Sequence, residues 1–216
     1  KTITLLSRMG YNFAPNAFYV EDLKTVTILA PYMWGPAQCS EIIKEPIILY
    51  ATLGHELYHS LFNPSSKILL NLYSHRRECI QNHYVEACSK YAVGASKSGN
   101  HTITEDGADI EGLRVTHEIM RQRYTEEELN SPIAGLETTL EQAFFYYAAS
   151  EFCEITSERS PEDAEDVHTA SNIRVNAAFS LMPEFSNAFQ CKKGDRMFVE
   201  EEKSCYVFGP NSGDKP

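Results

Sequence analysis

The stretch Gly54-His55-Glu56-Leu57-Tyr58-His59 decides how this chain of 216 residues is interpreted. On a helix, His55 and His59 lie one turn apart on the same face, so their imidazole nitrogens can bind one tetrahedral zinc ion. Glu56 follows the first histidine, and there its carboxylate can take a proton from a water molecule at the metal. The motif therefore predicts a helix of a zinc hydrolase, from about Pro46 to Phe62.

The residues around the two histidines are mostly apolar, which predicts that this helix is buried. They are Ile47, Ile48, Leu49, Tyr50, Ala51, Leu53, Leu57 and Leu61. An alternative is a buried helix whose two histidines are hydrogen-bonded core residues. Two histidines and an acid on an apolar helix are costly without a compensating partner, and this favours the metal interpretation.

A third ligand is expected in the segment Thr102–Arg114, which carries several acids at a predicted helix start. Thr104 can cap this helix, and acids suit its positive N-terminal end. Glu105 and Asp109 then lie one turn apart on the same face. Glu105 could bind the metal, and Asp109 could accept the second ring N–H of a ligand histidine. The alternative is a solvated acidic first turn, which is common.

Together these two segments resemble the neprilysin and endothelin-converting-enzyme family of zinc endopeptidases. The family motif G-E-N-x-A-D-x-G-G reads T-E-D-G-A-D-I-E-G here, with Thr104, Asp106 and Glu111 at the differing positions. The Gly-Phe-Asp that follows the second histidine in the family is Ser60-Leu61-Phe62. These differences leave the expected ligands and base in place. The resemblance implies one zinc ion per chain, held by His55, His59 and Glu105, with Glu56 as general base and Asp109 supporting the site.

The resemblance also implies substrate contacts elsewhere in the chain. Asn16-Ala17-Phe18-Tyr19 matches a family segment beside the bound peptide, followed by an expected edge strand at Val26 to Leu29. There the asparagine side chain and the alanine carbonyl bind the peptide backbone. His168 and Arg174 have the family spacing. By resemblance, His168 donates to the developing oxyanion and Arg174 holds a substrate carbonyl.

Six cysteines suit an oxidising compartment, and we expect an extracellular protein. By resemblance, Cys88 should pair with Cys205, whereas Cys153 and Cys191 match family cysteines whose partners lie in an N-terminal part. Cys39 and Cys79 have no family counterpart, and they could bridge each other or pair with the remaining two cysteines. Asn100-His101-Thr102 is an N-glycosylation sequon, which would require an exposed loop.

Composition sets the remaining limits. A net charge of −11 argues against nonspecific binding of nucleic acid, and no apolar run is long enough to span a membrane.

We expect an α+β, mostly α-helical zincin (thermolysin-like) domain with a small sheet edge, over residues 1–208, and a polar tail at residues 209–216. Beyond the zinc helix, further helices are expected within Ser65–Ala95 and over Leu136–Phe152, Thr169–Leu181 and Pro183–Phe189. Leu140, Phe144 and Tyr147 have helical spacing, and the aromatic rings among them are expected to pack in the core rather than line a substrate pocket.

The resulting hypothesis is a zinc-dependent endopeptidase that hydrolyses oligopeptides, with an N-terminal lobe in the same protein or in a separate chain as its partner. The family suggests an apolar substrate preference on the amine side of the cut. One alternative is an inactive homologue that serves as a binding or scaffold protein. Another is a zinc hydrolase of a different substrate class. Whether the chain is a fragment, a processed subunit or a short relative stays open.

Overall fold

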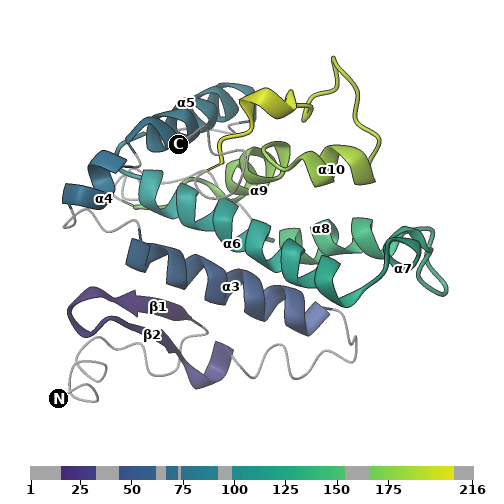
Figure 1. The fold of residues 1–216 in the computed structure, drawn as a ribbon, viewed down its shortest axis with the longest axis horizontal. Helices are drawn as coiled ribbons and strands as arrows, with labels where there is room; N and C mark the ends of the chain where they lie inside the picture. The colour runs from purple at the N-terminus through teal and green to yellow at the C-terminus, as the bar shows by residue number, and fades with distance from the viewer. Residues whose placement is uncertain are drawn as a thin grey trace.

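Two long helices, α3 (Lys44–Leu61) and α6 (Ile103–Arg123), lie side by side at the centre of the fold (Figure 1). A computed structural model describes residues 16–32, 44–61, 67–72, 74–91, 99–153 and 166–206. Helices dominate these residues, and a two-stranded sheet accompanies them. The expected mostly helical α+β fold is therefore confirmed. Helix α3 lies close to its expected range, and α6 begins within the segment Thr102–Arg114, where a helix start was expected.

Two glycines set the distance between α3 and α6. A Cβ atom on Gly112 would lie 2.7 Å from the backbone nitrogen of His55 and 2.8 Å from the carbonyl oxygen of Ala51. A Cβ atom on Gly54 would lie 2.8 Å from the Cα of Gly112. The helices thus approach backbone to backbone, with no room for a side chain at either position. This close approach brings the first turns of α6 within side-chain reach of the histidines on α3.

A short antiparallel hairpin lies on the outer side of α3. Its strands are β1 (Ala17–Val20) and β2 (Thr25–Ile28), joined through the 3-10 turn η1 (Glu21–Leu23) and by Lys24 in a left-handed conformation. Ala17 pairs with Ile28, and the N–H of Leu29 donates to the carbonyl of Asn16. Since hydrogen bonding alternates along such a pair, the backbone groups of Ala17 and Tyr19 point away from β2. Figure 1 shows that β1 lies between β2 and α3.

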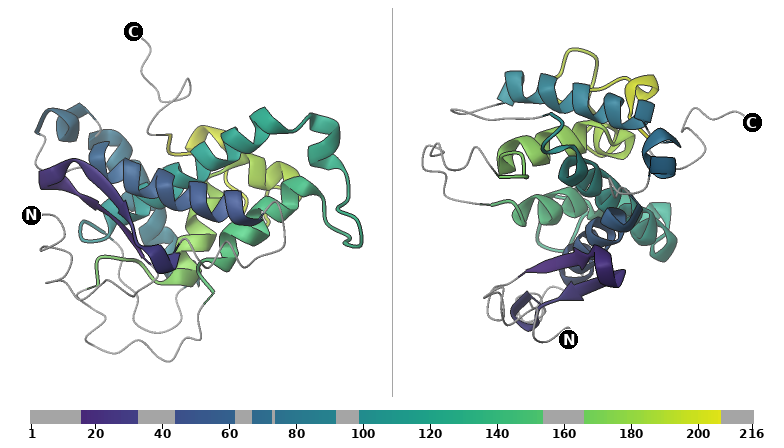
Figure 2. Two further views of the ribbon diagram at one scale, coloured as in Figure 1. Left: turned by 90° about the horizontal axis from the view of Figure 1, so that it is seen from below. Right: turned by 90° about the vertical axis from the view of Figure 1, so that its left-hand side faces the viewer.

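The other helices surround the two central helices (Figure 2). They are α4 (Lys67–Leu72), α5 (Ser74–Tyr91), α7 (Glu126–Asn130), α8 (Leu140–Ser150), α9 (Ser171–Ser180) and α10 (Pro183–Ala188), followed by the 3-10 turn η3 (Glu201–Lys203). Helices α5 and α9 pack on the far side of α6, and α8 packs against α3. Leu140 and Phe144 are buried in the core, as expected. Helix α8 begins four residues later than predicted because Thr139 caps it, in a capping box with Gln142.

The expected helix cap at Thr104 is wrong. Helix α6 begins at Ile103, and Thr102 occupies the N-cap position without a side-chain capping bond. The Thr102 hydroxyl donates instead to the buried carboxylate of Asp106, at 2.7 Å. Thr104 lies in the first turn and faces the cleft described below.

The expected disulfide between Cys88 and Cys205 is also wrong, because Cys205 is bonded to Cys79. Cys79 and Cys88 are nine residues apart on α5, which is about 13.5 Å and half a rotation around the helix. Cys205 can therefore reach only one of them. Cys79 is consequently not bonded to Cys39, Cys153 or Cys191, the partners considered from the sequence. Cys39 and the polar tail at residues 209–216 lie outside the described residues.

Within the part of the chain that the structure describes, no helix combines the length and the apolar character that crossing a bilayer requires.

Candidate metal centre and active site

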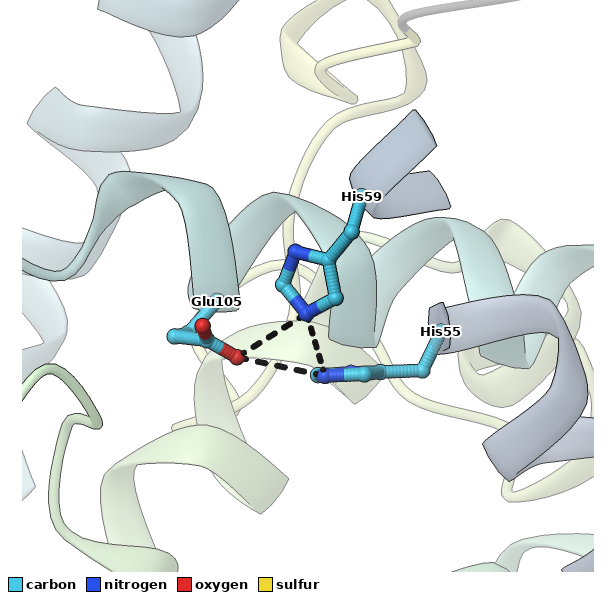
Figure 3. Close-up of side chains that lie close together, drawn as sticks. All are labelled: His55, His59 and Glu105. Atoms are coloured by element: carbon cyan, nitrogen blue, oxygen red, sulfur yellow. Dashed lines mark hydrogen bonds and ion pairs between the residues drawn. The ribbon is translucent and has the colours of Figure 1, made fainter. Parts of the chain in front are cut away.

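Three side chains from α3 and α6 converge on one point: His55, His59 and Glu105 (Figure 3). The Nε2 atoms of the two histidines are 3.1 Å apart, and they lie 3.2 and 3.3 Å from Oε2 of Glu105. Zinc bonds of about 2.0–2.1 Å to three corners of a tetrahedron would place the donor atoms about 3.3–3.4 Å apart. The donor types and separations therefore fit a zinc ion. All three residues line a cleft of about 650 Å³.

A buried charge network lies behind His55. Its Nδ1 lies 2.9 Å from Oδ1 of Asp109, and Arg174 binds the same carboxylate through Nε and Nη2, at 2.6 and 2.7 Å. A proton on Nδ1 leaves the lone pair of Nε2 facing the other donor atoms. Burial lowers the pKa of His55, but Asp109 and Glu105 outweigh it and bring that pKa to about 9. Burial raises the pKa of Asp109, but Arg174 and His55 outweigh it and lower that pKa to about 2.

Glu56 lies on α3 in the wall of the same cleft, with 7% of its surface exposed. Burial is the main cause that raises its pKa. The backbone N–H of Tyr19 in β1 acts in the opposite direction and favours the carboxylate. This contact agrees with the register of the hairpin, in which the backbone groups of Tyr19 face away from β2. Glu56 therefore lies between the donor atoms of α3 and the strand edge.

His168 approaches Glu105 from the segment that precedes α9. Its Nε2 lies 3.3 Å from Oε2 of Glu105, and its Nδ1 lies 2.9 Å from the carboxylate of Asp166. The pKa of His168 is raised, chiefly by the contact with Glu105. The pKa of Glu105 is lowered well below its ordinary value: burial would raise it, but the surrounding histidines outweigh burial.

Asp106 links the segment of His168 to the start of α6. Its carboxylate is 1% exposed and accepts hydrogen bonds from the hydroxyls of Thr102 and Thr169, both at 2.7 Å. Burial raises the pKa of Asp106 to about 7. Because Thr169 follows His168 and Asp106 follows Glu105, this contact holds the two cleft residues next to each other. It gives a structural reason for the acid at a position where the family motif has asparagine.

Asn16 and Ala17 lie at the start of β1 and line the cleft together with Phe18 and Tyr19. The side-chain oxygen of Asn16 accepts a hydrogen bond from the N–H of Ala17, at 2.8 Å. Arg174 lines the cleft too, and its guanidinium lies 4.7 Å from the centre of the Phe152 ring. Every metal, catalytic and substrate residue predicted from the sequence is thus brought to one cleft. Asn100, the sequon residue, is exposed in the turn before α6.

Sequence reasoning missed one wall of this cleft, which includes Tyr32, Thr52 and Glu151. Thr52 precedes Glu56 by four residues, so helical spacing could have placed it on the cleft face. Tyr32 and Glu151 come from separate segments, and no local pattern marks them. Arg114 was also missed. It joins Glu111, which stands at a family glycine position, to the carbonyls of Leu181 and Cys205.

The family model of peptidase family M13 matches residues 16–205. The chain belongs to peptidase family M13. The resemblance to neprilysin and endothelin-converting enzyme is therefore confirmed at the level of the family.

M13 relatives share low sequence identity with the chain. Neprilysin-3 of Drosophila melanogaster is 27% identical over 69% of this chain and 21% of its own length. Human endothelin-converting enzyme 1 is 27% identical over 67% of this chain and 20% of its own length. Neprilysin of Oryctolagus cuniculus is 24% identical over 89% of this chain and 28% of its own length. The chain therefore spans about a fifth to three tenths of the length of these relatives.

Two solved structures share the M13 fold. The zinc metalloprotease Zmp1 of Mycobacterium tuberculosis, in its open state, superposes with a TM-score of 0.67 at 17% identity, over 87% of this chain and 32% of that one. PepO of Lactobacillus rhamnosis also gives 0.67, at 20% identity, over 89% of this chain and 31% of that one. At these identities the likeness concerns the fold alone.

Proposed function

We propose that this chain is the catalytic part of a zinc-dependent endopeptidase that hydrolyses oligopeptides. One observation carries the proposal: the donor atoms of His55, His59 and Glu105 have the separations of a tetrahedral zinc site, in a cleft that also holds Glu56. Membership of peptidase family M13 supports the same reaction class.

The cleft offers a place for an extended peptide. The carbonyl groups of Ala17 and Tyr19 face away from β2, so an extended peptide can lie beside this strand and donate main-chain hydrogen bonds to them. The Asn16 side chain and the carbonyl of Ala17 are at the start of this edge, and Arg174 lines the cleft from α9. We assign these three residues to substrate alignment.

The remaining residues of the cleft transfer the protons and stabilise the charge that develops during hydrolysis. Zinc would lower the pKa of water and polarise the scissile carbonyl. Glu56 takes the proton of the attacking water and later delivers it to the leaving amine. His168 donates to the carbonyl oxygen as negative charge develops there. Asp109 fixes the tautomer and orientation of His55.

Two alternatives are weaker. An inactive binding homologue could lose its general base, whereas Glu56 is present and buried beside the three donor atoms. A hydrolase of another substrate class would not need a strand edge along its cleft.

We further propose an extracellular location and a partner lobe outside this chain. The disulfide Cys79–Cys205 and the exposed sequon at Asn100 suit a secreted or ectodomain setting. An additional lobe, in the same protein or in a separate chain, agrees with the small share of the M13 relatives that the chain spans.

The test is zinc content together with cleavage of a quenched peptide library, with and without chelator. We expect one zinc ion per chain, cleavage that the chelator abolishes, and a Glu56→Gln variant that keeps zinc and loses turnover. Glu127→Gln, an exposed site on α7, makes the same change of charge and should behave like the parent protein. A folded protein without zinc would overturn the metal site, and activity in Glu56→Gln would overturn the assignment of the base.

A further inference from the structure

We propose that the cleft selects peptides with a lysine or arginine side chain next to the scissile bond, and that Glu151 is the specificity residue that binds this cation. The inference rests on the proposed peptidase function and adds a substrate class to it. It starts from the wall of the cleft that none of the assigned catalytic or substrate residues uses.

Three polar side chains from distant segments meet on this wall. The hydroxyls of Tyr32 and Thr52 are hydrogen-bonded to each other, and the Tyr32 hydroxyl also donates to Oε2 of Glu151, at 3.3 Å. Tyr32 follows β2, Thr52 lies on α3, and Glu151 follows the last residue of α8. The arrangement anchors an exposed carboxylate at the end of α8 inside the cleft.

The same wall lies next to the reacting position. Ala51 and Thr52 precede His55 and Glu56 by four residues, so they lie about 6 Å further along nearly the same face of α3. A peptide whose scissile bond reaches Glu56 therefore places a neighbouring side chain against this wall. Such a side chain would extend between α3 and the end of α8.

Small and apolar side chains surround the path to Glu151. Ala51 and Ala148 line the cleft and project no further than a methyl group, and Phe152 adds an aromatic surface. A long methylene stem can pack along such walls while its charged end reaches a carboxylate. Lysine and arginine are built in this way, with an apolar stem and a cationic end.

The charges of the cleft favour a cation at this place. Arg174 is the sole arginine or lysine among the described residues that line the cleft, and Asp109 binds it through two hydrogen bonds. Glu151 is a further carboxylate, in addition to those that face the histidines. The pKa of Tyr32 is raised to about 12, mainly by burial, and the negative charges of Glu151 and Glu56 act in the same direction. A net charge of −11 would also attract cationic peptides.

The test uses two sets of quenched peptides, in which lysine, leucine or glutamate occupies the residue before or after the scissile bond. With the zinc-loaded protein, kcat/KM should be highest for one of the lysine peptides. Glu151→Gln keeps an oxygen that can accept from Tyr32 and removes the charge. We expect it to lower kcat/KM for that peptide by about tenfold, the scale of one hydrogen bond to a charged group, and to spare the leucine peptide. Glu151→Lys should reverse the preference towards glutamate. Glu127→Gln is the matched control.

A second measurement does not depend on turnover. Binding of the same peptides to zinc-loaded Glu56→Gln should be tighter for lysine than for leucine, and Glu151→Gln in that background should remove the difference. Cleavage that favours leucine and ignores Glu151 would overturn this inference and leave the proposed function standing. Absence of cleavage by the zinc-loaded protein would overturn the proposed function, and equal binding of all the peptides would then overturn the specificity inference separately.

Discussion

The two sides of α6 are attached to the molecule in different ways. Towards α3, Gly112 lies directly against the backbone of Ala51 and His55, and no side chain fits between the two helices at this point. Towards the C-terminal segment, the guanidinium of Arg114 donates hydrogen bonds to the carbonyls of Leu181 and Cys205. It also lies 4.3 Å from the centre of the Tyr206 ring. There the disulfide Cys79–Cys205 also ties α5 to the same segment. Figure 1 shows α3 and α5 on opposite sides of α6.

The contact with α3 fixes the geometry of the candidate metal centre, whereas the contacts on the α5 side stabilise the fold. The α3 side positions the candidate metal centre through backbone atoms, which cannot rotate away from an added group. The α5 side is held by the long side chain of Arg114 and by a disulfide bond. Substitutions of these residues remove contacts without displacing the residues of the cleft. We therefore expect changes on the α3 side to remove activity first. Changes on the α5 side should lower stability and leave activity at moderate temperature.

Gly112→Ala should have the largest effect. Its Cβ would lie 2.7 Å from the nitrogen of His55, so α3 and α6 must separate. Overpacking costs about 1–3 kcal/mol of unfolding free energy or more, and separation pulls Glu105 away from the histidines. Urea unfolding and a zinc titration would detect both losses. Val115→Ala, which removes volume from the same helix, should keep zinc. Full activity in Gly112→Ala would show that the close contact is not needed.

Asp109→Asn should have an intermediate effect that concerns the metal centre. The amide keeps the shape but removes the charge that faces His55 and Arg174. We expect zinc affinity to fall by about 10- to 100-fold, the usual cost of losing such a supporting partner, with a folded protein. Competition with a chelator measures the affinity, and circular dichroism checks the fold. Asp22→Asn, an exposed site in η1, makes the same change of charge and should leave affinity unaltered.

Cys79→Ser should have the smallest effect on activity while still costing stability. The disulfide spans 126 residues, and loss of such a link typically removes about 2–5 kcal/mol of unfolding free energy. The midpoint of thermal unfolding should fall, whereas kcat/KM at 25 °C should stay near that of the parent protein. Cys88→Ser on the same helix is the comparison. A larger fall for Cys88→Ser than for Cys79→Ser would restore the pairing expected from the family resemblance.

The sequence predicted the parts of this molecule that depend on local spacing. His55, His59, Glu105 and Asp109 lie at helical intervals on α3 and α6, so a pattern of four residues was enough to place each pair on one helix face. The start of α8 could also have been predicted, because Thr139 and Gln142 form a T-x-x-Q capping signal.

Other features depend on contacts between distant segments. Nothing local distinguishes Cys79 from Cys88 as the partner of Cys205, because only the fold selects the face of α5 that meets the C-terminal segment. Glu151 and Tyr32 are 119 residues apart, and they meet because α8 packs against α3. The pairing of the buried Glu111 with the partly buried Arg114 became meaningful only once the structure placed them beside the C-terminal segment.

The contact between Gly54 and Gly112 also has a consequence for the cell that makes this protein. On the proposed function, a newly made chain that has formed α3 alone carries two zinc ligands and the base but lacks the third ligand. The metal can be held tightly only after α6 has docked, so acquisition of zinc and completion of the tertiary fold become one event. A partly folded chain would then be unable to cut its neighbours during synthesis and export. Proteolytic activity would appear only in molecules that have finished folding.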